Sequence, residues 1–172
     1  NYIGKKVSIS PSCEIKKKSS NFIYIGNYVV ISSQVWLNIP VEAMPIVKKN
    51  KLKIKINDGV AIGRRSMITS LNYIEIGANV LLGPGVFIGD HSHNFDDKNT
   101  PIMHQGVTFP GRVIIEDGCW LGYHSAVIAN KGREVRIGRN SVIGANAVVT
   151  KSCPPNSILV GNPSKSLINL SE

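Results

Sequence analysis

Residues 137–153 read IGRNSVIGANAVVTKSC, and an aliphatic side chain recurs in this stretch at every sixth position. A small residue stands four positions after each aliphatic one. The aliphatic residues are Ile137, Ile143 and Val149, and the small ones are Ser141, Ala147 and Cys153. A fixed short period is the sequence signature of repeat architectures. The stretch therefore predicts a coil built from short segments of equal length.

The same six-residue frame extends upstream through almost the whole chain, in groups of three hexapeptides. The aliphatic positions upstream are Ile3, Ile9, Ile15, Ile25, Ile31, Leu37, Ile56, Ile62, Ile68, Ile76, Leu82, Ile88, Ile115, Leu121 and Val127. The positions four residues later mostly hold Val, Ser or Cys. Three hexapeptides per group predict a three-sided solenoid, with one short strand on each side and parallel pairing between coils. We expect an all-β fold, a triangular solenoid of about six coils.

The frame is interrupted only between groups, where the step from one aliphatic position to the next exceeds six residues. The two longest steps are 19 and 27 residues, which leaves insertions of 13 and 21 residues (19 − 6 and 27 − 6). Because no insertion falls within a group, all loops should leave the solenoid at one corner. A β-sandwich or β-barrel is the alternative, but it needs hairpin turns, and the chain has few hairpin dipeptides. The expected organisation is a β-helix domain over 1–155, with excursions near 38–55 and 94–114, and a tail over 156–172.

Composition narrows the choice of partners. The chain has 172 residues and a formal charge of +9 (20 basic minus 11 acidic residues), which indicates an anionic partner. Aromatic residues make up only 6%, too few for the stacking platforms that bind nucleic acid. The three cysteines form no CxxC pair, which favours a reducing compartment. No apolar run approaches the ~20 residues that span a bilayer. We expect a cytoplasmic protein, with the inner face of the membrane as the alternative place of action.

Two basic runs, KKK (16–18) and KKNKLKIK (48–55), lie on or beside the expected loop edge. Such runs attract an acidic glycan, a nucleotide-sugar or a lipid-linked pyrophosphate, or they serve only solubility.

Three motifs connect this solenoid with a known family. VIIEDGCWLGYHSAVI (113–128) and IGRNSVIGANAVVTKSCPPNSILVGNPSK (137–165) resemble the hexapeptide-repeat acyltransferases, in particular the galactoside and maltose O-acetyltransferases. GDHSH (89–93) is similar to the branch that acetylates bacterial surface polysaccharides or their precursors. The resemblance implies a left-handed parallel β-helix and acetyl-CoA as co-substrate. It also implies a homotrimer with active sites between subunits, and transfer to a sugar hydroxyl.

Transfer of an acetyl group from a thioester to a hydroxyl needs a base, for which histidine has a suitable pKa. The resemblance implies that His91 is this base, and that the Tyr123 backbone amide stabilises the oxyanion. His93, two residues on in an extended segment, should face the same side as His91 and orient it or the substrate. No metal is required.

The resemblance also implies a set of residues that contact acetyl-CoA, namely Trp120, Gly122, Ala145, Thr150, Lys151 and Lys165. We expect the acceptor to meet Asn94, Asp96 and His104 on the longest excursion, together with Asp97. The insertion NKGRE (130–134) departs from close relatives and could reshape the coenzyme channel.

Three other functions remain as alternatives. The first is N-acetylation of an amino sugar or small amine. The second is a zinc-dependent hydratase of the same fold, but it needs three converging histidines, and His91 and His93 share one segment. The third is a non-catalytic interaction module. The cysteines occupy the small positions of the frame, which indicates core thiols and argues against a covalent acetyl-cysteine mechanism.

Overall fold

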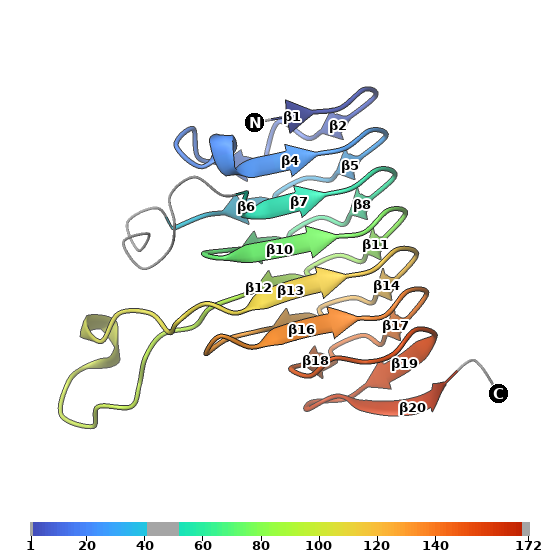
Figure 1. Cartoon of the computed structure of the whole chain (residues 1–172). Helices are drawn as coiled ribbons and strands as arrows, with labels where there is room; N and C mark the ends of the chain where they lie inside the picture. The colour runs from blue at the N-terminus through green and yellow to red at the C-terminus, as the bar shows by residue number, and fades with distance from the viewer. Residues whose placement is uncertain (1, 41–51, 170–172) are drawn as a thin grey trace.

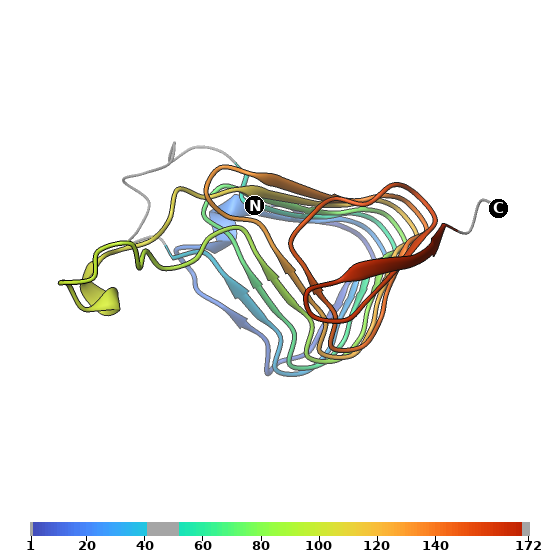
Figure 2. The same ribbon diagram turned by 90° about the horizontal axis from the view of Figure 1, so that it is seen from below.

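The computed structural model describes residues 2–40 and 52–169, and it shows three sheets wound into a triangular prism (Figures 1 and 2). The first sheet contains β1 (Tyr2–Ile3), β4 (Ile23–Ile25), β7 (Ile54–Ile56), β10 (Tyr73–Ile76), β13 (Arg112–Ile115) and β16 (Glu134–Ile137). The second contains β2 (Ser8–Ile9), β5 (Val30–Ile31), β8 (Ala61–Ile62), β11 (Leu81–Leu82), β14 (Trp120–Leu121), β17 (Val142–Ile143), β19 (Ser157–Val160) and β20 (Lys165–Asn169). The third contains β3 (Glu14–Ile15), β6 (Trp36–Asn38), β9 (Met67–Thr69), β12 (Phe87–Gly89), β15 (Ala126–Ile128) and β18 (Val148–Val149).

The chain visits the first, second and third sheets in turn and then begins the next coil. Strand pairs within each sheet are parallel except β19 with β20. The coils wind in a left-handed sense as they descend from the N-terminal end (Figures 1 and 2). The predicted left-handed parallel β-helix is therefore confirmed.

The aliphatic positions of the six-residue frame form the core. Ile31, Ile62 and Leu82 lie in register on successive coils of the second sheet, and each is at most 1% exposed. Burial of one such side chain contributes about 1.5–3 kcal/mol to the free energy of unfolding. The stability of the solenoid therefore grows with each coil that adds equivalent buried positions. Ile3 of β1 is an exception to the expected core, because it is 54% exposed at the N-terminal end of the described coils.

The coils approach one another most closely at glycines in the turns. A Cβ added to Gly63 would lie 2.5 Å from the Gly83 carbonyl carbon of the next coil and 2.6 Å from the Pro84 nitrogen. These are backbone atoms, so the clash cannot be relieved by a rotamer change.

We expect Gly63→Ala to separate two coils and to lower the free energy of unfolding by about 3 kcal/mol or more. Gly106→Ala is the matched control, because its added Cβ meets nothing within 4 Å and only its φ of +73° resists the change. That control should cost about 1 kcal/mol. Urea denaturation of both variants gives the two values, and equal losses would contradict the steric explanation.

Loops leave the prism at the corner between the third and first sheets, as predicted (Figure 2). Two boundaries differ from the expectation. The strand β12 ends at Gly89 and β13 begins at Arg112, so the longest excursion covers residues 90–111, whereas the expected one lies near 94–114. The expected tail over 156–172 contains β19, which pairs in parallel with β17, and β20, which pairs antiparallel with β19. The sheet therefore continues beyond residue 155.

The outer face of the first sheet is charged. Glu75 accepts hydrogen bonds from Lys55 Nζ (2.8 Å), the Tyr73 hydroxyl (2.8 Å) and Asn57 Nδ2 (3.2 Å). Burial raises the pKa of Glu75, but these hydrogen bonds outweigh it and the pKa is lowered. Burial and the Glu75 carboxylate raise the pKa of Tyr73 to about 12. The guanidinium of Arg112 lies 5.2 Å from the centre of the Tyr73 ring.

The Tyr73 hydroxyl should make the stability of the fold sensitive to alkali. Its pKa is higher in the folded chain than the ordinary value of 10.0, so the stabilisation is complete below pH 10 and is lost as pH rises toward 12. We expect the difference in stability between the wild type and Tyr73→Phe to shrink across that window. Urea denaturation of both proteins between pH 9 and 12 measures the difference, and a constant difference would refute the coupling.

No helix among the described residues is long and apolar enough to cross a membrane.

Candidate active site

Asp90, the first residue after β12, is fully buried and its carboxylate is surrounded by donors. It accepts hydrogen bonds from the backbone N–H groups of Leu71 (2.8 Å), Asn72 (2.8 Å) and Tyr73 (3.0 Å), in the turn that joins β9 to β10. Ser70 Oγ lies 2.7 Å from Asp90 Oδ2. A buried carboxylate is tolerated only when it is hydrogen-bonded in this way. The corner at the base of the longest excursion is thus built around one negative charge.

His91 is held by this carboxylate. Its Nδ1 lies 2.8 Å from Asp90 Oδ1, and its side chain is 11% exposed. A carboxylate partner places the proton of the neutral imidazole on Nδ1. Nε2 then remains as the acceptor that a bound ligand can use.

His91 lines a groove of about 370 Å³ on the outside of the third sheet. The polar residues of its lining are Asn38, Thr69, Ser92 and His93, and the apolar ones are Pro40, Met67, Phe87 and Val107. Asn38 Nδ2 donates to Thr69 Oγ1 at 3.1 Å, which fixes the orientation of these two side chains. The groove therefore offers a base, hydrogen-bonding groups and an apolar surface in one place.

Residues 92–108, here called the arm, leave the prism as a long projection (Figure 1). Ser92, His93 and Val107 of the arm line the groove. The arm begins as a short antiparallel ladder, with His93 opposite Val107 and the Thr108 N–H donating to the Ser92 carbonyl at 2.8 Å. At its far end, Gln105 Nε2 donates to the backbone carbonyls of residues 97 and 100. The arm is thus a preformed element whose base carries His93.

The residues expected to meet the acceptor lie on the arm, but the groove includes none of them. Asn94 uses its amide to hold the arm together, donating to the carbonyls of Gln105 (3.1 Å) and Val107 (3.0 Å). Asp96 is exposed and lies 3.5 Å from Lys131 Nζ. His104 ends the 3-10 helix η3 (Ile102–His104) and is exposed. Their roles toward an acceptor stay predictions.

The inserted segment 130–134 supports the arm. Lys131 Nζ lies 5.4 Å above the Phe95 ring and contacts Asp96, and the Gly132 N–H donates to the Phe109 carbonyl at 3.2 Å. Within the described chain the insertion therefore contacts the arm, and its effect on the coenzyme channel stays a prediction.

The residues expected to contact acetyl-CoA are spread over several parts of the prism. Trp120 points outward from β14 in the second sheet and is 51% exposed. Gly122 and Ala145 lie on successive coils at the corner between the second and third sheets. Thr150 and Lys151 follow β18 at the other corner of the third sheet, and Lys165 begins β20. One chain does not gather this set into one site.

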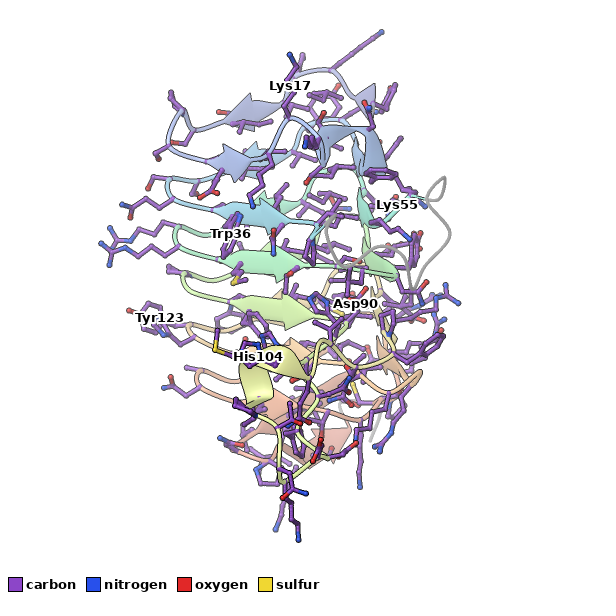
Figure 3. The ribbon with its side chains drawn as sticks, turned by 90° about the vertical axis from the view of Figure 1, so that its left-hand side faces the viewer. Lys17, Trp36, Lys55, Asp90, His104 and Tyr123 are labelled. Atoms are coloured by element: carbon purple, nitrogen blue, oxygen red, sulfur yellow. The ribbon has the colours of Figure 1, made fainter. Side chains whose placement is uncertain are left out.

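Tyr123 lies at the corner opposite Asp90, across the third sheet (Figure 3). Tyr123 is 55% exposed, and the centre of its ring lies 4.0 Å from that of His124, with the two ring planes tilted by 41°. Within one chain, the amide expected to stabilise the oxyanion is therefore not beside His91.

Sequence reasoning missed Asp90, and it also missed Asn38, Thr69 and Phe87, which line the groove. A signal for Asp90 was present, because it directly precedes His91 in the sequence. No comparable signal marked the residues of β6, β9 and β12, because outward positions follow no pattern in the frame.

The lysines and cysteines complete the chemistry of the described chain. Lys16, Lys17 and Lys18 are exposed, whereas Lys53 is buried and Lys55 is paired with Glu75. Residues 48–51 of the second basic run lie outside the described part.

Burial raises the pKa of the Cys119 thiol to about 11, which makes it a poor nucleophile. Cys13 and Cys153 are only partly buried but pack against the core. In residues 2–40 and 52–169, no three His, Cys, Asp or Glu side chains gather to hold a metal ion.

Comparison with protein families connects this geometry with known proteins. Residues 112–151 match the family model described as "Hexapeptide repeat of succinyl-transferase". A Mycobacterium tuberculosis protein named "Probable acetyltransferase" is 30% identical over 98% of this chain and 49% of its own length. Galactoside O-acetyltransferase of Escherichia coli is 37% identical over 52% of this chain and 41% of its own. The chain spans about half the length of the curated relatives that it matches.

Solved structures share the fold. The N-acyltransferase AntD from Bacillus cereus, in complex with dTDP and 3-hydroxybutyryl-CoA, superposes with a TM-score of 0.78 at 22% identity, over 98% of this chain and 82% of that one. A maltose O-acetyltransferase from Clostridium difficile has a TM-score of 0.61 at 27% identity, over 88% of this chain and 72% of that one.

Proposed function

We propose that this hexapeptide-repeat protein is an acetyl-CoA-dependent O-acetyltransferase that acts on a sugar hydroxyl, with His91 as general base. The observation that carries the proposal is the pairing of His91 Nδ1 with the buried Asp90 carboxylate at the edge of a solvent-open groove. The named relatives support the reaction class, since they are acetyltransferases. A surface polysaccharide of bacteria, or its precursor, is the acceptor that the GDHSH segment favours.

The two side chains account for the proton movements of such a reaction. The acceptor hydroxyl gives its proton to His91 Nε2 as its oxygen attacks the thioester carbon. The imidazolium that forms is stabilised by the adjacent Asp90 carboxylate. When the tetrahedral intermediate collapses, the C–S bond breaks and the imidazolium returns the proton to the departing coenzyme sulfur. The negative charge of Asp90 is present throughout and needs no rearrangement.

The lining of the groove supports a hydroxyl rather than an amine as acceptor. Among the described residues that line it, none is Asp or Glu, so no carboxylate is positioned to bind an ammonium group. Asn38, Thr69 and Ser92 instead offer neutral partners for hydroxyl groups. N-acylation of an amino sugar, the activity in the name of AntD, is the competing outcome.

We further propose that three copies assemble around a threefold axis. Two outer faces of the prism carry apolar side chains, and the third is charged. On the second sheet, Val30, Leu81 and Trp120 are 47%, 49% and 51% exposed. On the third sheet, Met67 and Phe87 point outward in register. Two different apolar faces suit a ring in which each copy contacts two neighbours.

This assembly would also complete the active site. The His91 groove lies on the third sheet, whereas Trp120 lies on the second and Tyr123 at their shared corner. A neighbour that presents its second sheet to the groove would bring its Trp120 toward His91. The coenzyme contacts proposed for Gly122, Ala145, Thr150, Lys151 and Lys165 then line a channel between subunits. We place the reaction in the cytoplasm, where the free thiols of Cys13, Cys119 and Cys153 remain reduced.

An acceptor screen tests the proposed function. The purified protein is incubated with acetyl-CoA and a panel of neutral sugars, amino sugars, nucleotide-sugars and acidic oligosaccharides. Release of the free thiol and a gain in mass of the acceptor report transfer. Transfer to a hydroxyl supports the proposal, and transfer only to amines replaces it with N-acetylation. Sedimentation velocity on the same sample gives the number of subunits.

A further inference from the structure

The outward side chains of the third sheet change abruptly in size beside His91. One outward position from each coil lies in a column down this sheet, in register from strand to strand. The column contains Glu14, Trp36, Met67, Phe87, Ala126 and Val148. From Trp36 to Phe87 the side chains are large and apolar, and below Phe87 they are small. Phe87 is therefore the last bulky residue above a shallower surface.

The ring of Phe87 extends along its strand toward the His91 corner. A Cβ added to Gly89, two residues on, would lie 2.9 Å from Phe87 Cζ and 3.5 Å from Thr69 Cγ2. The ring thus occupies the space that a side chain at position 89 would take. Phe87 and His91 line the same groove, so the ring limits the room beside the base.

The chemistry of the reactants indicates which of their groups the Phe87 ring contacts. A sugar acceptor and the coenzyme present hydroxyl, amide and phosphate groups, which need hydrogen-bonding partners. The sugar ring and the pantetheine arm mix these groups with apolar C–H surface, whereas the alkyl part of the acyl group is wholly apolar and is attached to the carbon that the activated hydroxyl attacks. The apolar ring of Phe87 beside the base is consequently suited to the acyl group, while the neighbouring polar side chains of Asn38 and Thr69 suit the acceptor.

We propose that Phe87 is the residue that determines acyl-group length, and that it restricts the donor to short groups such as acetyl. This inference rests on the proposed function. Phe87 serves better than Met67 as a limit, because a methionine side chain adapts its shape whereas a phenyl ring is rigid. Gly89 contributes because it has no side chain and so leaves space for the Phe87 ring.

Donor competition in Phe87→Ala tests this role. With an acceptor from the screen, kcat/KM is measured for acetyl-, propionyl-, butyryl- and hexanoyl-CoA. In the wild type, kcat/KM should fall steeply with chain length, since each methylene that a pocket cannot accommodate costs about tenfold or more. In Phe87→Ala, the ratio of hexanoyl to acetyl transfer should rise about 100-fold. Phe87→Leu, which removes less volume and preserves packing, should shift the ratio in the same direction by less.

Phe109→Ala is the matched control, because Phe109 is 64% exposed and does not line the groove. Its donor preference should equal that of the wild type. An unchanged ratio in both Phe87 variants overturns the inference, and so does a rise in acceptor KM without a change in donor preference, which would assign the Phe87 ring to the acceptor. If the wild type transfers acetyl normally, either result leaves the proposed function intact. Failure of the wild type with every donor and acceptor would instead refute the proposed function itself.

Discussion

Replacement of His91 by alanine is expected to reduce acetyl transfer about 1,000-fold, while the fold and the assembly persist. Among the described residues, the His91 imidazole is the one basic group that both pairs with a carboxylate and lines the groove. General-base catalysis by a positioned side chain contributes about 10²- to 10⁴-fold, which sets the size of the loss. Steady-state kcat/KM with acetyl-CoA and the best acceptor measures it.

His124→Ala serves as the control for this substitution. It removes the same ring at the opposite corner of the third sheet and should retain activity within a factor of about ten. The limb of the pH profile that reports the base should disappear in His91→Ala alone. Calorimetric binding of CoA should be unchanged in both variants. If His91→Ala retained near-normal activity and His93→Ala did not, the base would be His93, which lines the same groove.

The fold could be predicted because its signal is the six-residue spacing of aliphatic residues along the chain. Ile62 and Leu82 belong to different coils, but each is recognised from its own neighbours six residues away, and no knowledge of the partner is needed. Both are buried as expected. The prediction failed where another signal interrupted the spacing. Pro154 and Pro155 break the frame, yet beyond them β19 resumes with alternating buried positions at Ser157 and Leu159.

The candidate site was predictable only in part, because its geometry depends on contacts between coils. His91 was identified from a motif, but the donors to Asp90 come from the backbone of residues 71–73 on the preceding turn. Every residue except proline has a backbone N–H group, so no sequence pattern indicates which of these groups act as donors. The groove likewise joins outward side chains of β6, β9 and β12, which stacking alone brings together.

Asp90→Asn is expected to disable His91 without removing it. Four donors surround Asp90 Oδ2: the Ser70 hydroxyl and the N–H groups of residues 71–73, at 2.7 to 3.2 Å. The amide oxygen of asparagine must take this position, because an NH2 group there would face other donors. The NH2 group then occupies the place of Oδ1, 2.8 Å from His91 Nδ1. Because an NH2 group can only donate, His91 Nδ1 must accept, and the imidazole proton moves to Nε2. A general base needs Nε2 free of a proton, so His91 can no longer act as the base.

The loss of activity should therefore approach that of His91→Ala, at about 10³- to 10⁴-fold. The variant should also lose about 1–3 kcal/mol of stability, because the Leu71 N–H then meets a donor instead of Asp90 Oδ1. Nitrogen-15 NMR of the histidine ring distinguishes the two tautomers and should show the proton on Nε2 in the variant. Kinetic assays and urea denaturation provide the other two values.

Ser70→Ala separates the tautomer effect from a general loosening of the corner. It removes the Ser70 hydroxyl, which lies 2.7 Å from Asp90 Oδ2 and 2.9 Å from the Lys53 carbonyl oxygen, but it leaves the Asp90 carboxylate and its contact with His91. Activity should fall less than tenfold, although stability should fall by about 1 kcal/mol. Equal loss of activity in Ser70→Ala and Asp90→Asn would show that rigidity of the turn, and not the position of one proton, controls the base. Retention of the wild-type tautomer in Asp90→Asn would refute the mechanism directly, because the asparagine oxygen would then have to face His91.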